Sequence, residues 1–182
     1  MTKKVYLIRH CEALGQPPEA PLTKKGEEQA KSLAEFFKER EVDKIVSSPF
    51  IRAKSSINKV STNKKLDIEM DERLKERVLS TEDLPNWREL LQLSFTDLNL
   101  KPPGGESSLE AMNRIAAVIN EVLQSESENI LIVSHGNLLS LLLKKYDEGF
   151  GFESWQALTN PDVYQLTFFN ENMSYKRIWS DK

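Results

Sequence analysis

The sequence predicts an α/β protein, a three-layer α/β/α sandwich with a mostly parallel central sheet and a C-terminal antiparallel hairpin. Short apolar runs alternate with stretches of helical periodicity, which is typical of parallel strands covered by helices on both faces. The last two strand-like segments follow each other with only a turn between them. No internal repeat or Gly/Ser-rich linker divides the 182 residues, so we expect a single domain over residues 1–182.

The first predicted strand is the apolar run at residues 5–8, which is suited to a buried parallel strand. After a stretch containing several prolines, apolar residues recur at helical spacing, and Thr23 is a suitable cap for that helix. The apolar positions of this helix are Ala30, Leu33, Ala34 and Phe37.

A second strand is predicted at residues 44–46. Ser48-Pro49 follows it, and we expect Ser48 to cap a helix in which Pro49 takes the first position. That helix should run to about residue 60 and lead to a weak strand at residues 66–68.

Residues 71–105 are the least regular part of the chain and end in the breaker Pro102-Pro103-Gly104-Gly105. Ser107 and Glu110 then have the spacing of a capping box, which predicts the start of another helix. The residues expected on its apolar face are Leu109, Met112, Ala116, Ile119 and Leu123.

The clearest buried strand is predicted at residues 130–133, and a helix at 138–145 follows it almost directly. The C-terminal hairpin is predicted from strands at 163–169 and 174–179, with residues 170–172 as the turn.

Composition narrows the classes of function. The net charge is −3 with both signs interspersed, which gives no broad surface for nucleic acid or lipid. The longest apolar runs are far too short to cross a bilayer, and the first residues lack the features of a signal peptide. One cysteine permits neither an internal disulfide nor a multi-cysteine zinc site. We expect a cytoplasmic protein without nucleic-acid or membrane partners, and its oligomeric state is left open.

Both histidines of the chain directly follow predicted strands. His10 comes after residues 5–8 and Arg9, and His135 comes after residues 130–133 and a serine. The carboxyl ends of parallel strands form the usual ligand crevice of an α/β sheet. One such histidine could simply pack at a strand end, but two at equivalent positions favour a shared site.

Two arginines add an anion-binding character to this site. Arg52 is expected one turn into its helix, and helical side chains lean towards the helix N-terminus, so it can reach the crevice of Arg9. Guanidinium groups near helix N-termini suit phosphate. On its own, Arg52 would instead be interpreted as an exposed helix residue.

Several segments share the order and residue types of a known family. In that order they resemble the histidine phosphatase superfamily, the phosphoglycerate-mutase-like proteins, and the short chain is similar to its phosphatase-type members. The segments are Leu7-Ile8-Arg9-His10-Cys11-Glu12, residues 21–30, Ser47-Ser48-Pro49-Phe50-Ile51-Arg52-Ala53, Leu74-Lys75-Glu76, Pro103-Gly104-Gly105-Glu106-Ser107 and Val133-Ser134-His135-Gly136.

The resemblance implies a role for each residue. His10 would be the nucleophile and would form a covalent phosphohistidine. Arg9, Arg52 and His135 would hold the phosphoryl oxygens in the transition state. Glu76 would protonate the leaving oxygen and then activate water. No metal and no cofactor would be needed.

Three positions depart from the family pattern, and one role has a second candidate. Cys11 replaces a glycine, and its thiol is either reactive beside the cationic groups or a small, inert, buried side chain, which we favour. Ala13 replaces a common Thr or Ser. Gln16 stands where many members have a phosphate-binding asparagine, so we expect it to bind phosphate. Glu82 is the reserve candidate for the acid.

These features predict a metal-independent phosphomonoester hydrolase that acts on a small phosphorylated substrate. A phosphoglycerate-type mutase with the same intermediate and a non-catalytic phospholigand-binding protein are the alternatives. Residues 77–105, with Trp87 and an apolar run at 90–95, are expected to form a cap that selects the leaving group, unless they form a plain structural helix.

Overall fold

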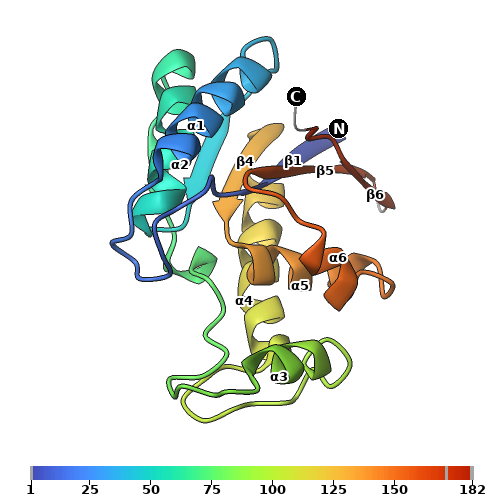
Figure 1. Ribbon diagram of the computed structural model, residues 1–182. Coiled ribbons are helices and arrows are strands. Elements are labelled where there is room, and N and C mark those ends of the chain that lie inside the picture. The colour runs from blue at the N-terminus through green and yellow to red at the C-terminus, as the bar shows by residue number, and fades with distance from the viewer. Residues whose placement is uncertain (1, 171, 181–182) are drawn as a thin grey trace.

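The computed structural model describes residues 2–170 and 172–180 and contains one six-stranded sheet with the order β3-β2-β4-β1-β5-β6 (Figure 1). Strands β3, β2, β4 and β1 are parallel, whereas β5 is antiparallel to both β1 and β6. The predicted fold class is therefore confirmed. The strands are β1 (Thr2–Arg9), β2 (Lys44–Ser47), β3 (Ile68–Met70), β4 (Asn129–Ser134), β5 (Asp162–Phe169) and β6 (Asn172–Arg177).

Helices form a layer on each face of this sheet (Figure 1). Helices α1 and α2 contribute to one apolar cluster, and α4 and α5 contribute to the other. The helices are α1 (Lys24–Phe37), α2 (Ile51–Lys64), α3 (Trp87–Leu93), α4 (Ser108–Gln124), α5 (Gly136–Tyr146) and α6 (Phe152–Gln156), with a 3-10 turn at Glu72–Leu74. No helix within the described residues is both long enough and apolar enough to span a membrane.

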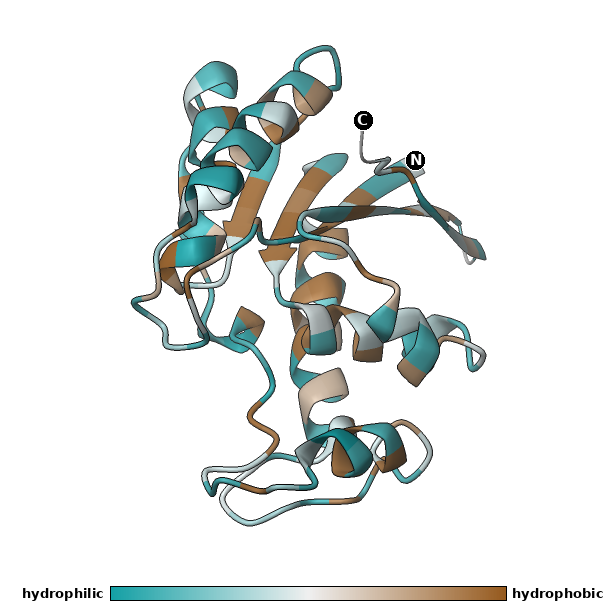
Figure 2. Cartoon of the chain, in the orientation of Figure 1, coloured by the Kyte–Doolittle hydropathy of each residue, from teal (hydrophilic) through white to brown (hydrophobic). Residues whose placement is uncertain are grey.

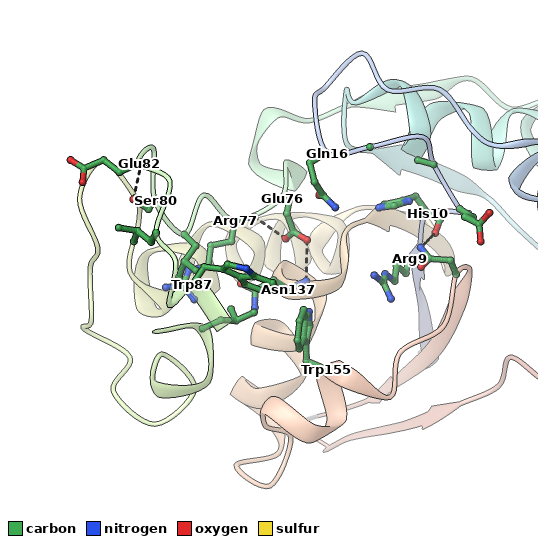
Figure 3. A pocket seen from close by; sticks show the side chains of 17 residues that line it. Arg9, His10, Gln16, Glu76, Arg77, Ser80, Glu82, Trp87, Asn137 and Trp155 are labelled. Atoms are coloured by element: carbon green, nitrogen blue, oxygen red, sulfur yellow. Dashed lines mark hydrogen bonds between the residues drawn. The ribbon is translucent and has the colours of Figure 1, made fainter. Parts of the chain in front are cut away.

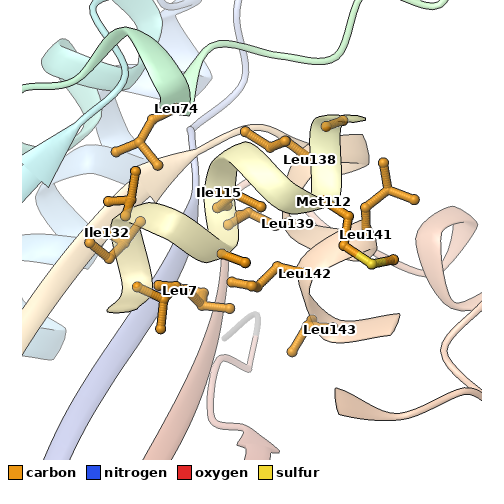
Figure 4. Packing of buried hydrophobic residues seen from close by; sticks show 14 of the residues in the cluster. Leu7, Leu74, Met112, Ile115, Ile132, Leu138, Leu139, Leu141, Leu142 and Leu143 are labelled. Atoms are coloured by element: carbon orange, nitrogen blue, oxygen red, sulfur yellow. The ribbon is translucent and has the colours of Figure 1, made fainter. Parts of the chain in front are cut away.

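Successive side chains of a strand point to opposite faces of the sheet, so one strand contributes residues to both apolar clusters. Leu7 of β1 packs with the α4/α5 cluster, whereas Tyr6 and Ile8 pack with the α1/α2 cluster, as the period of two in a strand requires. All six residues of β4 are buried, and the apolar strands stand out in the centre of Figure 2. Figure 4 shows side chains of β1 and β4 meeting those of α4 and α5.

The predicted caps of α1 and α4 are confirmed. The Thr23 hydroxyl accepts a hydrogen bond from the Gly26 N–H at 2.9 Å. Ser107 and Glu110 form a complete capping box, in which each side chain accepts from the other residue's backbone N–H.

The predicted start of α2 was wrong by two residues. The helix begins at Ile51, because Phe50 is still extended, with ψ of 137°. Pro49 therefore lies outside it. The Ser48 hydroxyl is 3.3 Å from the Phe50 N–H but also 2.8 Å from His135 Nε2, so it serves the site rather than the helix. The helix ends at Lys64, later than predicted.

Other boundaries also differ. Leu109 is 38% exposed, and Ile115, which was not predicted, is buried on the inner side of α4. Strand β3 begins at Ile68, and β6 ends at Arg177. Residue 171 of the predicted turn lies outside the described residues.

Candidate active site

The two histidines meet because their strands are neighbours. Strands β1 and β4 pair in parallel with Arg9 opposite Ser134, so the next residue of each strand lies at the same edge of the sheet. The His10 N–H donates to the Ser134 carbonyl at 3.1 Å. The rings of His10 and His135 are 5.1 Å apart, edge to face. The structure thus brings together the two histidines that the sequence placed at strand ends.

The hydrogen bonds of His10 define the state of its ring. Nδ1 lies 2.7 Å from the Cys11 carbonyl oxygen, which can only accept, so Nδ1 carries the proton. Nε2 is then the unprotonated nitrogen, and it accepts from Arg52 Nε at 3.2 Å. Burial above all, and then the charges of Arg52 and Arg9, lower the pKa of His10 to about 4. His10 is therefore neutral at pH 7, with the lone pair that a nucleophile needs.

Arg52 is buried, at 1% exposure, in the first turn of α2. Its Nη1 donates to the carbonyl oxygens of Gln16 at 3.0 Å and Pro17 at 2.9 Å. Burial lowers the pKa of its guanidinium, which the charge of Glu76 opposes. The 13–18 loop thus holds one side of this cation, while its Nε faces His10.

Arg9 is the second cation beside His10. Its Nη1 donates to the carbonyl oxygens of Leu158 at 3.2 Å and Thr159 at 3.4 Å, whereas its buried Nε has no hydrogen-bond partner within the described residues. Burial lowers its pKa, with Glu76 and Asp162 acting in the opposite direction. A Cβ on Gly136 would lie only 3.0 Å from this Nε, so a glycine leaves room for the guanidinium.

His135 is completely buried. Its Nε2 lies 2.8 Å from the Ser48 hydroxyl, and its Nδ1 has no hydrogen-bond partner within the described residues. Burial first, and then the positive charges around it, hold the pKa of His135 well below its usual range. The centre thus combines two neutral imidazoles with the buried guanidinium of Arg52 and the partly buried one of Arg9, an arrangement suited to a phosphate dianion.

The low pKa of His10 predicts a pH-dependent stability. In the unfolded chain its pKa returns to about 6.5, so the stabilisation is complete above that pH and is lost as the pH falls towards 4. We expect the free energy of unfolding to fall about 2 kcal/mol more between pH 7 and pH 5 in the wild type than in His10→Asn. Urea unfolding at both pH values measures this difference, and equal losses would contradict the low pKa.

Glu76 follows the 3-10 turn, and its carboxylate lies at the N-terminus of α5. Its Oε1 accepts from the backbone N–H groups of Arg77 at 2.8 Å and Leu138 at 2.9 Å, and its Oε2 accepts from Asn137 N–H at 3.1 Å. These three donors fix a carboxylate at the cavity wall (Figure 3). A carboxylate held in this way can exchange protons with a bound ligand.

The remaining predicted residues are placed less centrally. Glu82 also lines the cavity, but Figure 3 shows it at the outer end, far from His10 and pointing away from it. The exposed Gln16 side chain lines the cavity opposite Arg9, while the Gln16 carbonyl accepts from Arg52.

Cys11 lies beneath the site rather than in it. Its side chain is completely buried in the α1/α2 cluster, and burial raises the pKa of the thiol to about 12. These properties describe the small, inert side chain rather than a reactive thiolate. Ala13 lines the cavity with its methyl group.

The cavity has a volume of about 550 Å³ and extends from His10 to Trp87 (Figure 3). Its wall includes three residues that sequence reasoning missed: Asn137, Trp155 and Asn160. The Asn160 amide donates to the His10 carbonyl at 2.8 Å, and both polar atoms of the buried Asn137 side chain lack a hydrogen-bond partner within the described residues. The only local signal was that Asn137 follows His135-Gly136.

A metal-independent reaction stays a prediction. In the part of the chain that the structure describes, no group of three or more His, Cys, Asp or Glu side chains could hold a metal ion.

The chain matches a known protein family over almost its whole length. The family model described as "Histidine phosphatase superfamily (branch 1)" matches residues 5–181. A relative from Salmonella choleraesuis (strain SC-B67), named "Probable phosphoglycerate mutase GpmB", is 29% identical over 170 residues, which cover 84% of this chain and 77% of the relative.

Solved structures show the same fold. A mycobacterial glucosyl-3-phosphoglycerate phosphatase has a TM-score of 0.78 at 23% identity and 97% coverage of both chains. An alpha-ribazole phosphatase from Shigella flexneri has a TM-score of 0.77 at 23% identity, covering 97% of this chain and 96% of its own. At such identities the likeness shows the fold alone.

Proposed function

Because the chain belongs to the histidine phosphatase superfamily, we propose that it is a phosphomonoester hydrolase acting through a covalent phosphohistidine on His10. The observation that carries this proposal is the neutral His10 ring, whose unprotonated Nε2 accepts from the buried guanidinium of Arg52 and is also within the influence of the Arg9 charge. This arrangement combines a nucleophile with positive charge for a phosphate.

In the proposed first step, His10 Nε2 attacks the phosphorus atom, and the bond from phosphorus to the leaving oxygen breaks. The Arg52 Nε–H would donate its hydrogen bond to a phosphoryl oxygen instead of to His10. Arg9 Nε and His135 Nδ1, which have no partner among the described residues, would donate hydrogen bonds to the same phosphoryl group. The Glu76 carboxylate would first take up the proton of a monoanionic phosphate ester and then give that proton to the leaving oxygen.

In the second step, water attacks the phosphorus atom and the phosphorus–nitrogen bond breaks. Glu76 would accept the proton of this water, since its carboxylate is held at the cavity wall. The products are inorganic phosphate and the neutral His10 ring. The cycle balances without a metal or an oxidant, because protons and one phosphoryl group are all that move.

The cavity wall favours a phosphatase over a phosphoglycerate mutase, which is the second candidate. A glycerate carboxylate needs a cation, and the cations among the described lining residues are Arg9 and Arg77. Arg77 is nearly buried, and its guanidinium donates to Ser94 Oγ at 2.7 Å and to the Glu106 carbonyl at 3.2 Å. We therefore propose a cytoplasmic enzyme with a small phosphomonoester as its substrate class, and with residues 77–105 as the cap that selects the leaving group. The full set of histidines and arginines argues against a purely binding role.

The test is phosphate release from a generic aryl phosphate in the presence of excess chelator. We expect release to continue unchanged, because the proposed chemistry uses protein groups alone. Strong inhibition that a divalent ion reverses would contradict the proposal. In parallel, 3-phosphoglycerate should yield little 2-phosphoglycerate, whereas efficient interconversion would identify a mutase.

A further inference from the structure

The end of the cavity away from His10 has aromatic walls. Trp87 of α3 and Trp155 of α6 both line it, and Figure 3 shows them on the side where Asn137 and Glu76 face the cavity. Trp87 is 49% exposed, although a large apolar ring is normally buried. The other apolar lining residues here are Leu79, Leu84 and Leu91.

The two tryptophan-bearing helices are joined through Phe152. Its ring stacks on Trp155 with centroids 5.4 Å apart and planes at 29°. The guanidinium of Arg88, next to Trp87, lies 5.6 Å from the Phe152 centroid, and the Phe95 ring lies 6.3 Å from it. Because Phe152 stacks on Trp155 and is contacted by Arg88 of α3, the Trp155 indole is positioned before any ligand binds, which lowers the entropy cost of binding.

The charged groups at this end disfavour an anionic partner, because the lining residues include the carboxylates of Glu76 and Glu82. The guanidinium of Arg77 is engaged by Ser94 and Glu106, as described above. The Asn137 carboxamide is 7% exposed and offers an unpartnered donor and acceptor at the cavity wall. Indole faces beside a neutral amide are the surface that a planar ring with polar substituents would contact.

We propose that the cavity takes phosphomonoesters whose leaving group carries an aromatic ring, with Trp87 and Trp155 as the specificity-determining residues. This inference rests on the proposed hydrolase function and specifies its substrate class. The volume of about 550 Å³ exceeds what a three-carbon leaving group fills and lies in the range of sites for larger small molecules.

Substrate selectivity tests the proposal with two alkyl esters, benzyl phosphate and glycerol 1-phosphate, whose leaving alcohols are of similar acidity. The wild type should have the higher kcat/KM for benzyl phosphate. We expect Trp155→Ala and Trp87→Ala each to lower that value about five-fold or more, and to change the value for glycerol 1-phosphate less than about two-fold. Trp155→Phe should retain most of the benzyl phosphate activity.

Trp179→Phe is the matched control, because Trp179 packs on Phe36 in the other helical layer, with ring centroids 5.3 Å apart. It should leave the ratio of the two kcat/KM values unchanged. Equal losses on both esters in the Trp87 and Trp155 variants, or no loss on either, would overturn the aromatic site while leaving hydrolysis itself intact.

A binding measurement separates the aromatic site from the proposed reaction. In Trp179→Phe, all tryptophan fluorescence comes from Trp87 and Trp155, since the chain has three tryptophans. Benzylphosphonate, which cannot be hydrolysed, should change this fluorescence at concentrations that methylphosphonate does not. If the fluorescence changed but the protein had no phosphatase activity, the proposed aromatic site would stand and the proposed hydrolase function would be wrong. No change at saturating benzylphosphonate would overturn the site.

Discussion

Replacing His10 by alanine is expected to lower kcat for phosphomonoester hydrolysis by roughly 10⁴-fold or more, because it removes the atom that forms the covalent intermediate. The fold should persist, since the His10 side chain is only partly buried and contributes no apolar packing to either core cluster. Initial rates with an aryl phosphate give the loss of activity. Far-UV circular dichroism and the urea midpoint at pH 7 report whether the variant is folded. A folded variant with wild-type turnover would exclude the covalent mechanism.

Cys11→Ala is the matched control for this substitution. Cys11 is the next residue in the chain and also carries a nucleophilic atom, but its thiol is sealed in the core with a pKa raised to about 12. We expect this variant to keep most of the activity. Wild type quenched in alkaline denaturant should contain a phosphoryl group that is stable to alkali and labile to acid, as a phosphorus–nitrogen bond is, and His10→Ala should contain none.

Local sequence patterns predicted the helices and strands whose conformation depends on residues close in the sequence. The apolar run of β4 is buried on every side, so four consecutive apolar residues were sufficient to identify it. Thr23 and the Ser107–Glu110 pair cap their helices through contacts three residues apart. For both helices, the stabilising contact lies within the same short segment of sequence that predicted the cap.

Where distant contacts decide, the predictions were wrong or absent. Ser48 was expected to cap α2, but its hydroxyl contacts His135, 87 residues further along the chain. Helix α6 has five residues and no buried residue of its own. Its Phe152 ring packs on the α4/α5 cluster and contacts Phe95 and Arg88, and no local periodicity reveals these contacts.

The same distinction applies to the site. His10 and His135 could be paired from sequence because parallel strands end at one edge of the sheet, and Arg52 because helical side chains lean towards the helix N-terminus. Asn160 could not be placed, because it reaches the His10 carbonyl from a loop 150 residues away. Asn137 gave no signal beyond its position after His135-Gly136, because its distinguishing feature is an unpartnered amide, a property of three-dimensional packing.

Replacing Glu76 by glutamine is expected to lower kcat for alkyl phosphates by about 10²- to 10⁴-fold, since glutamine cannot transfer a proton. The loss should be much smaller for phosphorylation of the enzyme by an aryl phosphate with an acidic phenol, because that leaving oxygen departs without protonation. Comparing burst rates for benzyl phosphate and 4-nitrophenyl phosphate measures this dependence on the leaving group. It also controls for structural damage at the N-terminus of α5, where glutamine would lose part of the hydrogen bonding to the three N–H groups. Damage of that kind would slow both substrates equally.

Glu82→Gln is the matched control, because Glu82 is the other candidate for the residue that protonates the leaving oxygen. Both carboxylates line the cavity, but Glu82 lies at its outer end, where Figure 3 shows it directed away from His10. We expect this variant to retain turnover on both esters within about two-fold, because an exposed carboxylate at that distance reaches neither the leaving oxygen nor the attacking water. If Glu82→Gln instead lost alkyl phosphate activity selectively and Glu76→Gln did not, the acid would be Glu82. The cap would then have to close over His10 to bring Glu82 to the leaving oxygen.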